Sequence, residues 1–344
     1  MLMVVFGAGA SFDSDPNRPA RGIPSGEEHR PPLADQLFDD RPIFTSNIER
    51  FPACQPVIPY LRERGSKTVE QVLGELQAEG EGYRRRLSQL AAIRWYLRAM
   101  LAQCTANWLA TSHGLSNHKT LFDQIEQYGR PDEGVCLVTF NYDLLIERAL
   151  ESLDIYVSDI PDYIRNDRYK LFKLHGSINW SRDIELPTII LFPVTHGDGI
   201  ANTLIQRAAD LKIRAHYVSD AEIVPSDPKF PRFPAIAIPV EDKRDFECPP
   251  EHLDALESCL PRVTRMLTVG WRATEKPFLD LLKRHFKYKQ KLMVVAQDLR
   301  GAETTITNIR NAGVPLQEDI VRPYSSTFTD FVVNRAGENF LQIG

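Results

Sequence analysis

The sequence of 344 residues contains no apolar run near the roughly 18 residues that a membrane-spanning helix needs. It also lacks an excess of positive charge, because 41 Lys and Arg stand against 46 Asp and Glu, for a formal net charge of −5. That balance disfavours a protein that holds nucleic acid through its overall field. With 43% hydrophobic and 25% charged residues, the composition is that of a globular protein and excludes a disordered chain.

Cysteine pairs are also missing. The five cysteines form no C-x-x-C pair, so the sequence supports neither a zinc ribbon nor a dithiol redox site. An odd, scattered set is typical of reduced, buried thiols. They are Cys54, Cys104, Cys136, Cys248 and Cys259.

The N-terminus lacks the parts of a signal peptide. Residues 1–6 are apolar, and Ala8-Gly9-Ala10 imitates a cleavage site. No Lys or Arg precedes Arg18, however, and the apolar run is too short for a secretory core. We therefore expect a buried strand from Leu2 and a cytoplasmic protein.

Apolar runs and helical stripes alternate along the chain. Buried strands are predicted at 2–6, 135–139, 170–174, 265–269 and 291–296, and helices at 119–128, 144–153, 252–260 and 276–286. From Leu87 to Trp108, apolar residues recur at spacings of three and four, which predicts a long amphipathic helix. The alternation predicts an α/β fold, a Rossmann-like, doubly wound, mostly parallel sheet. We expect a single domain over 1–344 with a helical insertion at 45–130. Ligands of such sheets bind where the strands end.

The first strand ends in Gly7-Ala8-Gly9-Ala10-Ser11. Small residues let backbone N–H groups approach a phosphate, and a helix start favours negative charge. The dinucleotide spacing G-x-G-x-x-G fails because Phe12 holds the sixth position, and no P-loop is present. A tight turn without a ligand explains this segment equally well.

Polar residues follow two further strands. Asn141 can orient a water or a sugar hydroxyl, and Asp143 can accept a hydrogen bond from one. Either residue could instead cap the helix that follows. His175 stands between a buried strand and Gly176-Ser177, where an imidazole suits a proton acceptor, although a lone core histidine is the commoner case.

Four strand ends together carry a family resemblance. The chain resembles the sirtuin-like (silent information regulator 2-like) NAD-binding proteins in the G-A-G-x-S loop, a T-x-N-x-D motif, an H-G pair and a late glycine motif. In this sequence they are Gly7–Ser11, Thr139–Asp143, His175-Gly176 and Val269–Arg272, in the family's order.

The resemblance implies roles for these positions. Asn141 would order a water or ribose beside the nicotinamide ribosyl bond, and His175 would be the general base. Asp143 would support the sugar or the loop. The remaining residues would bind NAD as substrate through its diphosphate, ribose and adenosine; they are Gly7, Ala8, Gly9, Ala10, Ser11, Gly270, Trp271, Gln297 and Asp298.

The sequence also departs from the deacylating sirtuins. It cannot build their four-cysteine zinc module, so no metal is expected, and Arg272 replaces the usual serine. The forms T-F-N-Y-D and L-H-G-S-x-N-W (Leu174–Trp180) are similar to NAD-hydrolysing effectors of bacterial antiphage defence. That resemblance implies an NAD glycohydrolase that acts in abortive infection. An NAD-dependent deacylase and a non-catalytic NAD- or ADP-ribose-sensing or structural subunit remain alternatives.

The resemblance further implies control by assembly. We expect a homo-oligomer, or a separate partner such as a HerA-type hexameric ATPase, and neither a membrane nor nucleic acid as direct partner. Candidate contact surfaces are the helical block and the apolar tail of Phe340, Leu341 and Ile343. A basic helix face formed by Arg84–Arg86, Arg94 and Arg98 is the feature that a nucleic-acid role would use.

Overall fold

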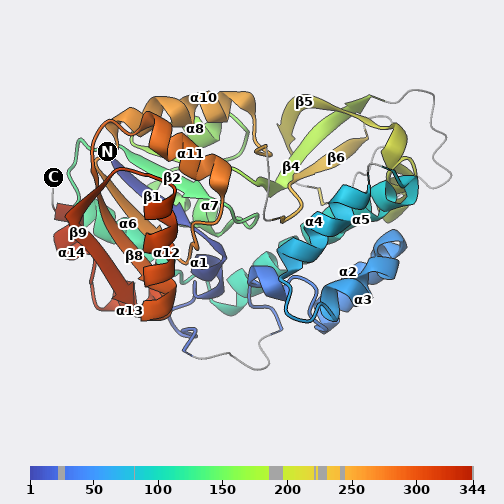
Figure 1. Ribbon diagram of the computed structural model, residues 1–344, viewed down its shortest axis with the longest axis horizontal. Coiled ribbons are helices and arrows are strands. Elements are labelled where there is room, and N and C mark those ends of the chain that lie inside the picture. The colour runs from blue at the N-terminus through green and yellow to red at the C-terminus, as the bar shows by residue number, and fades with distance from the viewer. Residues whose placement is uncertain are drawn as a thin grey trace.

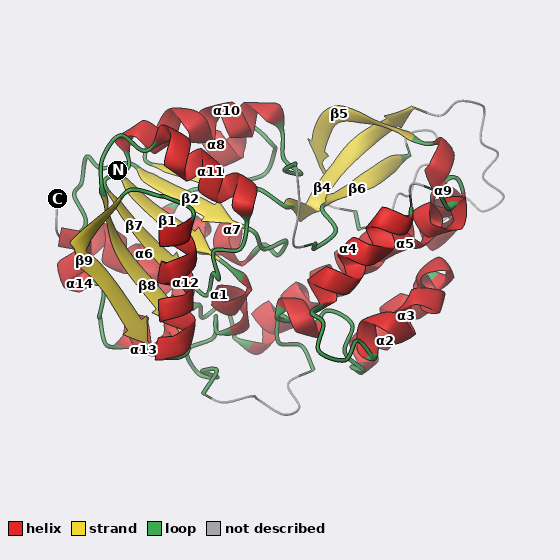
Figure 2. Cartoon of the chain, viewed as in Figure 1, coloured by secondary structure: helices red, strands yellow, loops and turns green. Residues whose placement is uncertain are grey.

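The computed structural model describes residues 1–21, 28–80, 82–185, 197–220, 222–223, 231–240 and 245–342. The chain forms two lobes that lie side by side (Figure 1). The main lobe surrounds a six-stranded sheet, whereas the second lobe joins helices to a three-stranded sheet (Figure 2).

The main sheet has the predicted doubly wound arrangement. Its order is β3-β2-β1-β7-β8-β9, and each of its strand pairs is parallel. This is the Rossmann strand order, with the reversal beside β1. All five predicted strands are present, together with a sixth that was not predicted. The strands are β1 (Leu2–Phe6), β2 (Val135–Thr139), β3 (Tyr169–Lys173), β7 (Arg265–Val269), β8 (Gln290–Ala296) and β9 (Leu316–Ser325).

The central strands are in step with one another. Phe6 pairs with Thr139 on one side and with Val269 on the other, and Thr139 pairs in turn with Lys173. These strands therefore end at one level, and the residues that follow them gather at one edge. β1, β2 and β7 are buried along their whole length, as continuous apolar runs require.

Helices cover both faces of this sheet. α13 and α14 both contact α6, and α8, α10 and α11 gather on the other side (Figure 1). The helices of the lobe are α1 (Ala8–Phe12), α6 (Asn117–Tyr128), α7 (Leu145–Leu150), α8 (Asp162–Arg165), α10 (Pro250–Cys259), α11 (Lys276–His285), α12 (Leu299–Asn311), α13 (Phe328–Val333) and α14 (Glu338–Gln342).

The second lobe has its own hydrophobic core, formed by helices and by strands from much later in the chain. α5 crosses this core, and Thr68 begins α4 with a capping box. The three strands are antiparallel in the order β5-β4-β6. The elements are α2 (Pro42–Arg50), α3 (Ile58–Arg62), α4 (Val69–Glu79), α5 (Arg84–Thr111), β4 (Gly176–Glu185), α9 (Gly197–Gln206), β5 (Lys212–Ser219) and β6 (Arg232–Ile236).

The single domain and the insertion at 45–130 stay predictions. α6 lies inside that range but packs with the main lobe, whereas β4–β6 lie outside it and pack with the second core.

Two expected contact residues are not available at the surface. Phe340 and Leu341, which were named as part of a candidate contact surface, are buried in the main core; Ile343 lies outside the described residues, and the contact surface stays a prediction. Their side chains complete the core beside α6 instead. In the described part of the chain, no helix is long and apolar enough to cross a membrane.

Candidate functional site

A cleft of about 330 Å³ opens at the level ends of β1, β2, β3, β7 and β8. Glu70 and Leu101 of the second lobe form part of its wall, so the cleft lies between the lobes. It brings together every predicted site residue except Ala10, which is fully buried behind the wall. The predicted residues that line it are Gly7, Ala8, Gly9, Ser11, Asn141, Asp143, His175, Gly270, Trp271, Gln297 and Asp298.

Three glycines make the floor of the cleft possible. A Cβ on Gly7 would lie 2.4 Å from the Gly270 carbonyl oxygen, and one on Gly9 would lie 2.8 Å from the Gly270 Cα. Gly270 itself has φ +59°, and its Cβ would lie 2.5 Å from the Ala10 nitrogen. The β1–α1 turn and the end of β7 therefore touch backbone to backbone, which only glycine permits here.

Protein groups already use several amides of this turn. Gly7 N–H donates to Val269 O, Gly9 N–H to Gly270 O, and Ala10 N–H to Gly7 O. These bonds account for the glycine motif as a structural turn. A bound phosphate would meet the remaining surface of the turn, at Ala8 and the Ser11 hydroxyl.

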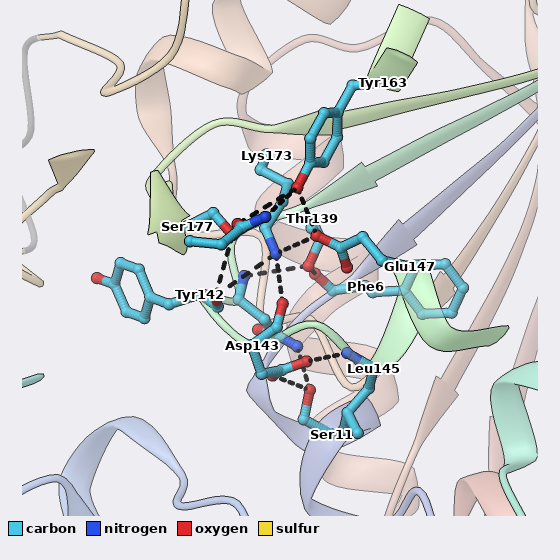
Figure 3. A network of polar contacts seen from close by, with 12 residues as sticks. Phe6, Ser11, Thr139, Tyr142, Asp143, Leu145, Glu147, Tyr163, Lys173 and Ser177 are labelled. Carbon is cyan, nitrogen blue, oxygen red and sulfur yellow. Dashed lines mark hydrogen bonds and ion pairs between the residues drawn. The ribbon is translucent and has the colours of Figure 1, made fainter. Parts of the chain in front are cut away.

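Asn141, Ser11 and Asp143 form one buried hydrogen-bonded network. Figure 3 shows the part of it that joins Ser11 to Asp143. Asn141 Nδ2 donates to Gly7 O and to Ser11 Oγ, both at 2.8 Å, and Ser11 Oγ donates to Asp143 Oδ2 at 2.6 Å. Since Gly7 O can only accept, the amide nitrogen must face it, and both its hydrogens are used. The Asn141 Oδ1 atom therefore remains for a ligand in the cleft.

Asp143 lies one residue before Leu144, the N-cap of α7, but its side chain still binds the start of that helix. Its Oδ1 accepts the Leu145 N–H at the start of α7, at 3.0 Å. Asn141 has other partners and does not cap that helix.

A buried ion pair supports the same loop from behind. Lys173 Nζ lies 2.8 Å from Glu147 Oε1 and also donates to the Asp143 carbonyl (Figure 3). Tyr163 OH donates to the same Glu147 oxygen at 3.0 Å. Sequence reasoning missed this pair, although a lysine at the end of a buried strand was a signal that a carboxylate must face it.

His175 follows β3 and is buried at the wall of the cleft, where it directly precedes β4. Its ring centroid lies 4.9 Å from that of Phe140. Phe140 in turn stacks on Trp271 at 5.8 Å, with 14° between the ring planes. His175 thus belongs to an aromatic wall, and Glu275 fixes the Trp271 end of that wall by accepting the indole N–H at 2.5 Å.

The other predicted binding residues lie at the margin of the cleft. Gln297 and Asp298 are exposed, and Asp298 caps α12 by accepting the Gly301 N–H at 2.7 Å. Arg272, whose side chain is 67% exposed, lies 4.0 Å from Asp35 and is the only Lys or Arg among the described residues that line the cleft.

Two further residues escaped sequence reasoning. Glu70 of α4 reaches the cleft from the second lobe. His118 is fully buried between the rings of Phe6 and Phe328, and burial lowers its pKa to about 4 against the opposing charge of Asp143. Glu70 lies in a segment with a helical pattern, but no local signal marked it as a cleft residue or His118 as a core residue.

Part of the sequence matches a known protein family. Residues 135–192 match the SIR2-like domain family. The SIR2-like segment contains β2, α7, α8, β3 and β4, and therefore both Asn141 and His175. The matched segment thus includes two of the loops that face the cleft.

Solved sirtuin structures resemble the chain weakly. "Sir2-p53 peptide-NAD+" has a TM-score of 0.39 at 14% identity, over 99% of this chain and 93% of that one. "Sir2 bound to acetylated peptide" has a TM-score of 0.37 at 14% identity, over 100% and 94%. No curated protein sequence matches significantly. The Rossmann-like fold of this chain is therefore assigned from the strand order of its own main sheet.

The five cysteines are free and buried. Among the described residues, no group of three or more His, Cys, Asp or Glu side chains could hold a metal ion. The metal-free site stays a prediction.

Proposed function

We propose that this chain hydrolyses NAD to nicotinamide and ADP-ribose. The observation that carries the proposal is the meeting of Asn141 and His175 at adjacent strand ends of one cleft, within the SIR2-like segment. The resemblance of the four strand-end motifs to NAD-binding proteins supports NAD as the substrate class.

The polar groups of the cleft suit this reaction. The bond between ribose C1′ and the nicotinamide nitrogen breaks, nicotinamide leaves as a neutral molecule, and a water oxygen bonds to C1′. Asn141 Oδ1, fixed because both amide hydrogens are engaged, orients the water. His175 accepts the proton that the water loses.

Charges around the cleft match the two ends of the dinucleotide. Glu70 and Glu275 line the part of the cleft beside His175, where positive charge builds on the ribose as nicotinamide leaves. Arg272 follows Trp271 in the lining of the cleft and would meet the diphosphate.

Nicotinamide release tests the proposal directly. The purified chain is incubated with NAD, alone and with any partner protein, and nicotinamide and ADP-ribose are quantified. Asn141→Ala and His175→Ala should each lower kcat at least about 100-fold, because each removes a group that acts on the water. Circular dichroism confirms that the variants fold. Activity that survives both substitutions would refute the assignment.

An acetylated peptide separates hydrolysis from deacylation. A hydrolase releases nicotinamide without the peptide and forms ADP-ribose, whereas a deacylase needs the peptide and forms O-acetyl-ADP-ribose. Tight NAD binding without turnover under either condition would favour a sensing subunit.

We further propose that the hydrolase is an antiphage effector controlled by assembly, as a homo-oligomer or with a HerA-type ATPase. Light scattering of the chain with and without its candidate partner, beside the nicotinamide assay, tests this. A strict monomer that is fully active alone would count against it.

A further inference from the structure

The loop that carries Asn141 is anchored in both lobes at once. Phe140 packs into the main core, whereas Tyr142 packs into the second core, and Asn141 lies between them at the cleft. Figure 3 shows the Tyr142 ring pointing away from Phe6 and Glu147. Any change in the position of Tyr142 therefore acts on its neighbour Asn141.

One residue of the second lobe holds both loops of the site. Ala237 directly follows β6; its N–H donates to the His175 carbonyl at 2.9 Å, and its own carbonyl accepts from Tyr142 OH at 2.9 Å. We name this arrangement, Tyr142–Ala237–His175, the Ala237 bridge. Burial raises the pKa of the Tyr142 hydroxyl above its usual value, so the phenol keeps the proton that it donates.

The backbone around the bridge has little room to move. The Tyr142 carbonyl accepts the Ile178 N–H of β4 at 3.0 Å. Gly176, with φ +85°, lets β6 approach so closely that an added Cβ would lie 1.9 Å from the Ala235 carbonyl oxygen. The second lobe thus binds the backbone of Tyr142, which follows Asn141, and the backbone of His175.

We propose that Tyr142 is a positioning residue, which fixes the position of Asn141 relative to His175 through Ala237. This inference rests on the proposed hydrolase activity. Tyr142 makes no bond to the reacting atoms in this role; its hydroxyl ties two loops from neighbouring strands to one point of the second lobe. Loss of that tie lets the two loops move independently and disturbs their alignment for reaction.

Tyr142→Phe tests the bridge because it keeps the ring and removes only the hydroxyl. We expect kcat for nicotinamide release to fall about tenfold and KM to change less than about twofold. The matched control is Tyr169→Phe, which also removes a hydroxyl hydrogen bond of a mostly buried tyrosine, to Glu126, away from the cleft. The control should keep its kcat. An unchanged kcat in Tyr142→Phe, or a raised KM alone, would overturn the positioning role.

Hydrogen exchange tests the bridge without relying on activity. In Tyr142→Phe, the amides of Asn141, Ala237 and Ile178 should exchange about tenfold faster than in the wild type, and in Tyr169→Phe they should not. If the wild-type chain releases no nicotinamide, the hydrolase proposal fails while this measurement still decides the bridge. Unchanged exchange at all three amides would overturn it.

Discussion

Two of the buried cations, one in each lobe, hold the loops of the site by different means. Lys173 of the main lobe is fully buried and faces the Glu147 carboxylate. Arg98 of the second lobe, only 1% exposed, donates to the Ile178 and Glu222 carbonyls and to Ser181 Oγ, at 2.7–2.9 Å. In the described part of the chain it forms no ion pair with a carboxylate. Burial lowers the Arg98 pKa to about 10.

The difference shows how the cleft is held from two sides. Lys173 binds the carbonyls of Tyr142 and Asp143 from inside the main lobe. Arg98 binds Ile178, whose N–H donates to that same Tyr142 carbonyl. In the main lobe, the Glu147 carboxylate compensates the charge of Lys173. In the second lobe, two backbone carbonyls and a hydroxyl surround the charge of Arg98. Removing either cation should therefore have different consequences.

Lys173→Met should give the largest effect. It leaves Glu147 buried with Tyr163 OH as its hydrogen-bond donor and no cation, so the free energy of unfolding should fall by about 3–5 kcal/mol. Urea denaturation measures the loss. Lys173→Met combined with Glu147→Gln removes both charges and should recover part of it. Equal losses of unfolding free energy in the single and double variants would show that Lys173 does not stabilise the protein by compensating the charge of Glu147.

Acid should weaken the main lobe through His118. Burial lowers its pKa to about 4 from 6.5, so the unfolded chain binds a proton between those values that the folded chain does not. Stability is therefore lost as the pH falls through this range, by about 2 kcal/mol between pH 7 and pH 5. Urea denaturation at both pH values should show a smaller difference for His118→Gln. An identical pH dependence in the variant would remove His118 from this role.

Arg98→Met should have the smallest effect of the three. It leaves two carbonyls without their donor but also removes a desolvated charge, so we expect a loss of about 1–2 kcal/mol in the free energy of unfolding. Urea denaturation in parallel with Lys173→Met completes the comparison. A loss as large as that of Lys173→Met would mean that Arg98 has a close carboxylate partner in solution.

The main sheet was predictable because its signals are local. Five of its strands are short, mostly apolar segments, and the polar residues that follow them were enough to place Asn141 and His175 at one edge. β9 escaped because it is the edge strand, with Glu318, Asp319 and Pro323 interrupting its apolar pattern.

The second lobe was not predictable in the same way. Its core joins α5 to Phe233 and Ile236 of β6, which no periodicity within either segment can reveal. The Ala237 bridge is hidden for the same reason: an alanine carries no chemical signal, and only its two backbone groups reach the site.

The discontinuous second core also affects how the protein is made. During synthesis, the helices up to residue 111 leave the ribosome long before β6, the strand that completes their core. Their apolar faces stay uncovered by that strand until it is synthesised, whereas β2 and β3 of the main sheet are synthesised before it. Residues 37–111 therefore form the segment most in need of a chaperone, and truncation before β6 should yield an insoluble product.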